Sequence, residues 1–196
     1  MTDIKILGIS GSLRKDSFNR AALRVAAEMA PAGVALSTFE LHDIPIYNQD
    51  VEATPPASVL EFKHQITSSD AILFVTPEYN YSISGVLKNA IDWASRPYGQ
   101  SAWLGKPAAI MGASSGNLGT ARAQYHLRQI LVTLNMPTVN QPEVMISNAA
   151  QRFDQMGALT DEPTRQIIGK LLIALVDLTK LVSTNKDLRC AETLLL

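Results

Sequence analysis

The sequence predicts an α/β fold, in which five parallel strands form one sheet with helices on both faces. Short apolar segments alternate along the chain with segments whose apolar residues recur at helical spacing. Residues 71–76, AILFVT, are apolar almost throughout, as expected for a parallel strand that is covered on both faces. Parallel neighbours need crossover connections, and right-handed helical crossovers place helices on both faces of the sheet.

The first half of the chain is expected to hold three strands and two helices. Residues 5–10, KILGIS, form a short apolar strand. Apolar residues then recur at helical spacing over 18–29, until a proline and a glycine end the helix. Residues 35–41, ALSTFEL, alternate as a strand does, and a proline opens the helix expected over 56–68. The buried strand at 71–76 follows.

The second half is expected to complete the sheet with two more strands. A short helix near 87–94 leads to the apolar strand AAIMGA at 108–113. A helix over about 119–134 precedes a weaker strand at 143–146. A long amphipathic helix from 161 to about 184 then covers the sheet with its apolar stripe.

The composition excludes several classes of protein. Seventeen Lys and Arg against eighteen Asp and Glu leave a formal net charge of -1, which provides no broad field for nucleic acid or an anionic membrane. The single cysteine, Cys190, excludes an intramolecular disulfide and favours a reducing, cytoplasmic location. No uninterrupted apolar run approaches the roughly 20 residues of a membrane span. We expect one domain over residues 1–185 and a C-terminal tail over 186–196.

Three polar loops follow the first, third and fourth expected strands. They span residues 10–19 (SGSLRKDSFN), 77–85 (PEYNYSISG) and 114–119 (SSGNLG). In an open parallel sheet the ligand crevice lies beyond the carboxyl ends of the strands, where the strand order reverses. These loops are therefore expected to meet there and to form the binding site.

The first loop has the chemistry of a phosphate site. Ser10, Ser12 and Ser17 each carry a hydroxyl that can donate a hydrogen bond, and Arg14 adds a planar cation. The amides at the N-terminus of the following helix are further donors. Together these groups suit a phosphate monoester, with Asn19 placed to hold the loop or to cap the helix. The alternative is structural: Ser17 caps the helix and the other hydroxyls face solvent.

Other motifs for phosphates or nucleophiles do not fit this loop. The chain has no Gly-Lys-Ser or Gly-Lys-Thr, which a P-loop requires, and no Gly-x-Gly-x-x-Gly dinucleotide fingerprint. Residues 8–12, GISGS, lack the last glycine of the Gly-x-Ser-x-Gly nucleophile elbow. Of the three histidines, His64 and His126 fall inside expected helices rather than on strand-end loops, which disfavours a hydrolase; the third is His42.

The second loop is suited to a flat ring. A proline and a glycine fix its ends, and Tyr79, Asn80 and Tyr81 can lie along the edge and face of a ring. The structural alternative is that Glu78 caps a nearby amide and the loop closes on its own side chains. The third loop consists mostly of small residues, which let the backbone approach a ligand closely.

Three motifs carry a resemblance to a known family: GSLRKDSFNRAAL, TPEYNYSISGVLKNAIDWASRP and GASSGNLGTARAQYHLRQIL. Over residues 4–146 the chain resembles the NAD(P)H-dependent FMN reductases, the group that includes quinone, azo-dye and chromate reductases. The resemblance implies a flavodoxin-like three-layer sandwich. It assigns the FMN phosphate to Ser12, Arg14, Ser17 and Asn19, the isoalloxazine and ribityl chain to Pro77, Glu78, Tyr79, Asn80, Ser82 and Ile83, and the rest of the pocket to Ser114, Ser115 and Gly116, with Ser10 as a further candidate.

The resemblance also implies an activity. NADPH or NADH would reduce FMN and leave, and an acceptor such as a quinone, an azo compound, chromate or free flavin would then take its place in a ping-pong mechanism. Since the flavin carries the chemistry, no catalytic side chain and no metal are assigned. Two alternatives stay open: a non-enzymatic, flavodoxin-like electron carrier, and a regulatory or scaffold module of the same fold. The small net charge favours the enzyme over the carrier.

A homo-oligomer is expected as well, because members of this family commonly form dimers or tetramers; we expect a tetramer built from dimers. The candidate interface residues lie on two helices and are Leu87, Ile91, Trp93, Arg122, Tyr125 and Arg128, with Glu143 as a charge partner for Arg122. For Leu87 and Ile91 an ordinary core position is the favoured alternative.

One position departs from the family pattern. Ser84 stands where the family usually has proline. Loss of the fixed φ is expected to loosen the loop without removing a ligand contact.

Overall fold

The computed structural model describes residues 4–193, with side chains as far as residue 184. Five strands form one sheet in the order β2-β1-β3-β4-β5, and every neighbouring pair is parallel. The strands are β1 (Ile4–Ser10), β2 (Val34–Phe39), β3 (Ala71–Val75), β4 (Ala108–Ala113) and β5 (Val144–Ile146). The helices are α1 (Phe18–Glu28), α2 (Ala57–Thr67), α3 (Gly85–Ala94), α4 (Ala121–Thr133) and α5 (Glu162–Thr193), with short 3-10 helices η1 (Gln49–Val51) and η2 (Ala149–Gln151). The predicted α/β fold is confirmed.

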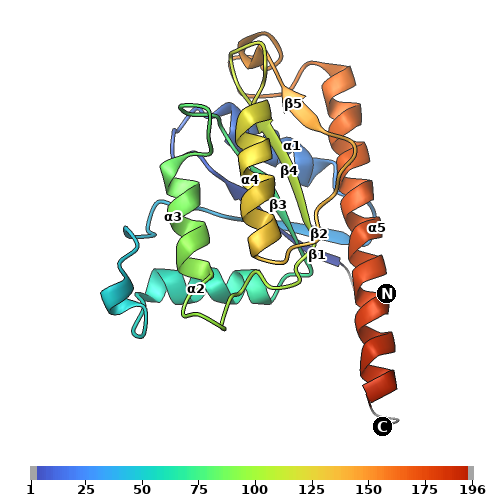
Figure 1. Ribbon diagram of the computed structural model, residues 1–196. Coiled ribbons are helices and arrows are strands. Elements are labelled where there is room, and N and C mark those ends of the chain that lie inside the picture. Colours follow the sequence, from blue (N-terminus) through green and yellow to red (C-terminus); the bar gives the residue numbers. More distant parts are fainter. Residues whose placement is uncertain (1–3, 194–196) are drawn as a thin grey trace.

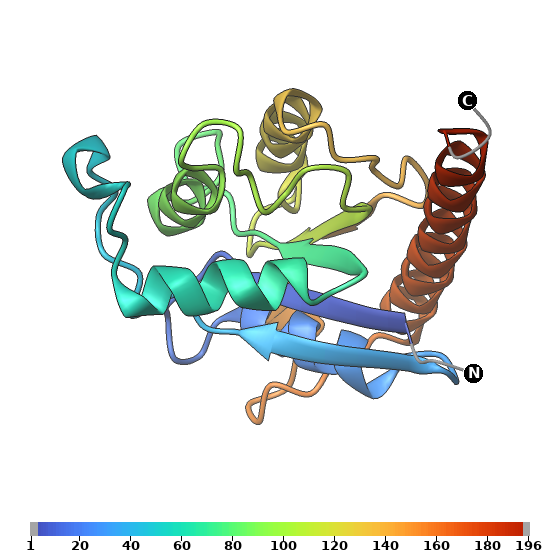
Figure 2. The same cartoon turned by 90° about the horizontal axis from the view of Figure 1, so that it is seen from below.

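The sheet lies between two layers of helices (Figure 1 and Figure 2). Helices α1 and α5 pack on one face, and α2, α3 and α4 pack on the other. Because side chains alternate along a strand, β3 sends Leu73 and Val75 into the first layer and Ile72 and Phe74 into the second. Every side chain of β3 is buried, which explains why its sequence is apolar throughout.

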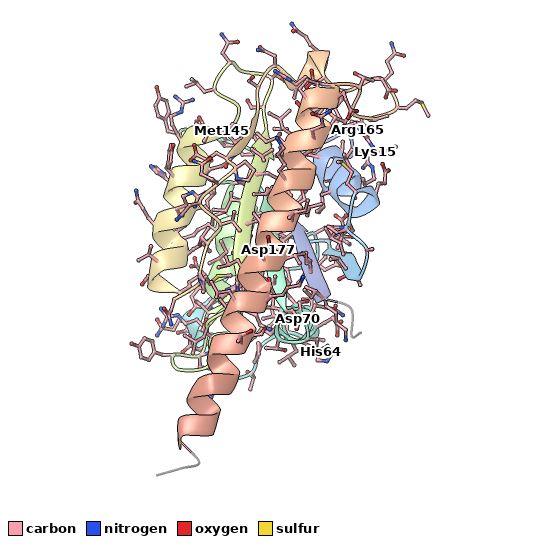
Figure 3. The ribbon with its side chains drawn as sticks, turned by 90° about the vertical axis from the view of Figure 1, so that its right-hand side faces the viewer. Lys15, His64, Asp70, Met145, Arg165 and Asp177 are labelled. Carbon is pink, nitrogen blue, oxygen red and sulfur yellow. The ribbon has the colours of Figure 1, made fainter. Side chains whose placement is uncertain are left out.

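The strand order reverses between β1 and β3, since the chain first adds β2 on one side of β1 and then adds β3, β4 and β5 on the other. The carboxyl ends of the two central strands therefore open onto a crevice. Figure 3 shows the two ends of the sheet: Lys15, which follows β1, lies at the same end as Met145 of β5, and His64 and Asp70 lie at the opposite end.

Helix α5 is longer than the sequence predicts. Its end was expected at about Thr184, whereas it runs to Thr193, and its last turns extend past the rest of the molecule in Figure 3. Residues 185–193, NKDLRCAET, contain no proline or glycine to end the helix, so that expectation is wrong. Of the expected tail, residues 186–193 are helical, and residues 194–196 lie outside the described part. The domain boundary at residue 185 stays a prediction.

The length of α5 does not make it a membrane span. Among the described residues, no helix is both long enough and apolar enough to cross a bilayer.

The KNAIDW segment of α3 holds a long loop against the fold. Asn89 accepts a hydrogen bond from Tyr47 N (2.7 Å) and donates one to Pro45 O (2.8 Å). Trp93 Nε1 donates to the same carbonyl (2.9 Å), and the ring of Trp93 meets the ring of Tyr47 edge to face at 5.0 Å. This part of the motif is therefore structural.

Three predicted interface residues belong to the core instead. Trp93 is 1% exposed, so its assignment to an interface is wrong. Leu87 and Ile91 are buried between α3 and the sheet, which confirms the favoured alternative that both are ordinary core residues.

Candidate functional site

The three polar loops meet at the carboxyl edge of the sheet, where a cavity of about 230 Å3 opens. All three loops and the first turn of α1 contribute to its walls. The lining residues are Ser12, Arg14, Ser17, Phe18, Asn19, Pro77, Glu78, Tyr79, Ala113, Ser114 and Ser115. All of them except Phe18 and Ala113 are site residues that the sequence predicts.

A second cavity of about 370 Å3 adjoins the first, because Glu78 and Ser114 line both. Its other walls are Asn80, Tyr81, Gly116, Asn117, Leu118, Gly119 and Arg122. Cavities of this order hold small molecules and cofactors. The first cavity is dominated by the serines and the arginine of the first loop. The third loop forms most of the second cavity, and the second loop and Arg122 of α4 complete it.

Asn19 ties the first loop to the end of β4. Its Nδ2 donates to Ala113 O (2.9 Å), and its Oδ1 accepts from Ala113 N (2.8 Å). Asn19 is 4% exposed. Both polar atoms of the side chain are committed to Ala113, so Asn19 has the loop-holding role that the sequence allows.

Replacement of Asn19 by alanine is expected to lower the free energy of unfolding by about 2 kcal/mol, because it leaves the amide and carbonyl of Ala113 buried without these partners. Urea unfolding followed by circular dichroism measures the change. Glu28→Ala, at an exposed position of the same helix, is the control and should change the free energy by less than about 0.5 kcal/mol. Equal losses in the two variants would contradict the role of Asn19.

The first loop holds hydrogen-bond donors that the protein itself does not use. Within the described part of the chain, no group accepts a hydrogen bond from the backbone amides of Ser12, Leu13, Lys15 or Asp16. Ser10 is 6% exposed, and its hydroxyl is one of two buried side-chain groups of described residues without a hydrogen-bond partner. Leu13, Lys15 and Asp16 are exposed, so their amides are open to solvent or to a ligand. A loop before a helix N-terminus that presents this many spare donors suits a ligand rich in acceptors.

Ser17 and Arg14 combine structural contacts with spare donors. Ser17 Oγ accepts from Asn19 N (3.2 Å) and Arg20 N (3.4 Å), so the helix-capping alternative for Ser17 is confirmed. The cap uses only the oxygen as acceptor, and the O–H can still donate to a ligand. The guanidinium of Arg14 donates to a carbonyl of its own loop and lies over the ring of Phe18, 5.4 Å from its centroid. Its remaining N–H groups can meet an anion.

The second loop contains a tight turn with an unusual backbone. Tyr79 N donates to Ser82 O and Ser82 N donates to Tyr79 O, both at 3.0 Å. The two central residues have positive φ, 51° at Asn80 and 69° at Tyr81. This left-handed conformation is uncommon outside glycine and strained for a bulky residue such as tyrosine. Other contacts must therefore hold the turn.

Glu78 reaches from this loop to the start of α4. Its Oε2 accepts from the amides of Arg122 (3.0 Å) and Ala123 (3.2 Å), and its Oε1 accepts from Arg122 Nε (2.5 Å). The guanidinium forms an ion pair with the carboxylate, and its Cζ lies 3.7 Å from the centroid of the Tyr81 ring. The amide-capping alternative for Glu78 is confirmed. Within the chain Arg122 is paired with Glu78. Its pairing with Glu143 in an oligomer stays a prediction.

Ser84 joins the first two loops. Its Oγ donates to Gly11 O (2.6 Å) and, as the cap of α3, accepts from Leu87 N (3.3 Å). The φ of Ser84 is -65°, which proline also adopts. The loops are close here, since a Cβ at Gly11 would lie 3.1 Å from Ser84 Oγ and 3.2 Å from Pro77 Cδ. Serine thus replaces the fixed φ of proline with a hydrogen bond between loops.

Three predicted residues do not line either cavity. Ser82 Oγ lies 3.1 Å from His126 Nδ1, and Ile83 is buried in the core between the sheet and helices α2, α3 and α4. Ser10 lies at the end of β1, outside both linings. For Ile83, only the backbone is available to a ligand.

The histidines do not gather in the cavities. His64 lies at the far end of the sheet from Lys15 (Figure 3), with Ser68 Oγ 3.3 Å from its Nε2. His42 contacts Asp43 at 3.1 Å. His126 contacts Ser82, but neither residue lines either of the two cavities, so the histidines give no support to a hydrolase.

Sequence reasoning missed several lining residues. They are Phe18, Ala113, Asn117, Leu118, Gly119 and Arg122. A signal for Arg122 was present, because it lies in the first turn of the helix after the third loop, and such turns face the crevice in this type of sheet.

The strand order 2-1-3-4-5, with a donor-rich loop after β1 at the point of reversal, defines a flavodoxin-like protein with a mononucleotide site. The comparison with family models agrees: the model for NADPH-dependent FMN reductase matches residues 4–151. The chain belongs to the NADPH-dependent FMN reductase family. Its predicted class, an FMN-dependent oxidoreductase of flavodoxin-like fold, is confirmed.

Individual relatives are similar along most of the chain. An NAD(P)H-dependent FMN reductase of Pseudomonas aeruginosa is 57% identical over 175 residues, which cover 88% of this chain and 94% of that protein. A 2-hydroxy-1,4-benzoquinone reductase of Burkholderia sp is 46% identical over 165 residues, covering 84% and 90%. The structure of FerB, a flavoenzyme NAD(P)H:(acceptor) oxidoreductase from Paracoccus denitrificans, matches with a TM-score of 0.83 and 41% identity, covering 90% of this chain and 97% of that one.

Proposed function

We propose that the two adjoining cavities hold FMN and that the protein passes hydride from NADPH or NADH through it to small-molecule acceptors, in the first place quinones. The observation that carries this proposal is the set of unused donors in the first loop at the carboxyl end of β1. FMN supplies the hydride chemistry when it is bound. The chain's own residues bind and orient it.

In this proposal the phosphate lies in the first cavity. The free amides of Ser12, Leu13, Lys15 and Asp16 are available to it, the hydroxyls of Ser12 and Ser17 donate to it, and Arg14 balances its charge. Ser10 lies where the first loop leaves β1 and offers a further hydroxyl, and Asn19 fixes the loop to β4.

The flavin ring and ribityl chain then extend toward the second cavity. The backbone of the second loop and the third loop line this path. The residues proposed to contact them are Pro77, Glu78, Tyr79, Asn80, Ser114, Ser115 and Gly116, which line the cavities, and also Ser82 and Ile83, which follow in the second loop. For Glu78 and Ile83 the contact is through the backbone, because their side chains are engaged elsewhere.

An open rim of aromatic side chains supports a mechanism in which the nicotinamide and the electron acceptor bind in turn at the same face of the flavin. Tyr79 and Tyr81 are both exposed at the mouth of the site, and flat aromatic molecules pack well against such side chains. A quinone fits this rim, and the relative from Burkholderia is named for a benzoquinone. We therefore expect ping-pong kinetics with quinone acceptors.

The absorption spectrum tests the function. Purified protein titrated with FMN is expected to bind it, and the flavin bands should bleach on anaerobic addition of NADPH or NADH and return when benzoquinone is added. Bands that never bleach with either nicotinamide would point to an electron carrier. A protein that neither retains nor takes up FMN would overturn the proposal.

We also propose that the chain forms a homo-oligomer, a dimer or a tetramer built from dimers, through the outer face of α4. Tyr125 and Val132 are exposed and seven residues apart, so they share this face. Tyr125 OH donates a hydrogen bond to Glu143 Oε2 (3.5 Å), and this bond raises the pKa of Tyr125 above its ordinary value. Light scattering at micromolar concentration tests the assembly, and a monomeric mass would overturn it.

A cytoplasmic location is proposed on the single cysteine alone.

A further inference from the structure

We propose that Glu78 is a positioning residue for the flavin ring. Acting through Arg122 and the N-terminus of α4, its carboxylate holds the turn at Asn80 and Tyr81 in the shape that receives the ring. This role rests on the proposed function, since it requires that FMN occupies the second cavity.

The first observation is the number of donors that converge on Glu78. Two backbone amides of α4 and the guanidinium of Arg122 all donate to its two oxygens, and the side chain is 5% exposed. The cap residue of α4, Thr120, makes no side-chain capping bond. A carboxylate from another loop therefore caps this helix, where the free amides and the helix dipole favour a negative charge.

The second observation is that the contacts of Glu78 return to its own loop. Arg122 is held by the carboxylate, and its guanidinium lies against the face of the Tyr81 ring. Tyr81 is one of the two residues with positive φ. A strained turn persists only where its surroundings hold it, and the chain of contacts from Glu78 through Arg122 to Tyr81 supplies that constraint.

The third observation is that the carboxylate is fully engaged within the protein. One oxygen accepts two amide hydrogen bonds and the other accepts from the guanidinium. Glu78 therefore acts on the ring by shaping the turn and not by direct contact of its carboxylate. Because the same turn lines the second cavity, its loss should weaken binding of the ring and leave the phosphate contacts in the first loop intact.

The test compares binding of FMN and riboflavin, which share the ring and differ in the phosphate, by quenching of flavin fluorescence. Glu78→Gln is expected to raise both dissociation constants by the same factor, about tenfold, because its amide cannot accept from all three donors and leaves Arg122 unpaired. Glu78→Asp keeps the charge but is one methylene shorter, and its effect should be intermediate. In the flavin-free protein, amide hydrogen exchange at Tyr79 and Ser82 should be faster in Glu78→Gln than in the wild type.

Two further variants show whether Glu78 and Arg122 act as one unit. Arg122→Gln should weaken both flavins as well, and the double variant Glu78→Gln/Arg122→Gln should be weaker than Glu78→Gln by no more than about twofold. The matched control is Glu40→Gln, which removes a carboxylate paired with Arg20 at 2.9 Å on the surface and should leave both dissociation constants within about twofold of the wild type.

The outcomes separate this role from the proposed function. Unchanged flavin affinity and unchanged exchange in Glu78→Gln would overturn the positioning role while the wild type still binds FMN. A weakening of FMN alone, with riboflavin unaffected, would also overturn it. A wild type that takes up no flavin would overturn the proposed function and the role together. Circular dichroism checks that each variant folds, and Glu78→Asp carries the comparison if Glu78→Gln does not fold.

Discussion

Gly112→Ala is expected to lower the free energy of unfolding by about 3 kcal/mol, because the added methyl group has no space. A Cβ at this position of β4 would lie 2.3 Å from the backbone carbonyl of Thr76 and 2.1 Å from Oγ1 of Thr120. Neither atom can move freely. The Thr76 carbonyl belongs to the backbone at the end of β3, where Thr76 N donates to Met111 O, and Thr120 is fully buried before α4.

Urea unfolding measures this loss, and Gly85→Ala is the matched control. Both variants add one methyl group to a glycine, but a Cβ at Gly85 meets nothing within 4 Å and lies at the start of α3. The control should be neutral or more stable by up to about 1 kcal/mol, since alanine is the better helix former. A loss below about 1 kcal/mol in Gly112→Ala would show that the end of β3 shifts easily. We also expect weaker FMN binding, because Thr76 and Thr120 lead into the second loop and α4.

The fold could be predicted to the extent that local patterns encode it. The apolar run of β3 marks a strand buried by both helical layers, and a segment of six residues is enough to show this pattern. The end of α5 could not be read in the same way. No proline or glycine stops the helix after Thr184, and the amphipathic stripe that guided the prediction reports only where the helix packs against the sheet, not where it ends.

The residues of the site also differ in how far the sequence predicts them. Topology alone brings the three loops together, which is why Ser12, Arg14 and Ser17 gather in one cavity as expected. The roles of Trp93 and Arg122 depend instead on partners far away in the sequence. Trp93 Nε1 donates to a carbonyl 48 residues earlier, and Arg122 meets a carboxylate 44 residues earlier. No spacing rule within a helix encodes such pairs, so the sequence does not predict either contact.

Arg14→Met is expected to raise the dissociation constant of FMN by about 30-fold and to leave that of riboflavin unchanged. A hydrogen bond between a guanidinium and a phosphate dianion contributes about 2 kcal/mol to binding, which corresponds to this factor. Riboflavin has no phosphate, so it cannot lose this hydrogen bond. Methionine keeps an apolar stem of similar length, so the packing against Phe18 is retained. Fluorescence quenching with the two flavins measures both constants in one preparation.

Ionic strength gives an independent check on the same residue. Since charge pairs at an open site are screened by salt, the difference between the wild type and Arg14→Met should shrink as salt is raised, whereas the binding of riboflavin should not depend on the variant at any salt concentration. Arg14 is exposed on the first loop, so the substitution should not disturb the core. Equal weakening of FMN and riboflavin would mean that Arg14 supports the ring rather than the phosphate. The phosphate would then have to be held by the free amides and hydroxyls of the first loop without a balancing cation, and the proposed placement of FMN along the crevice would have to be revised.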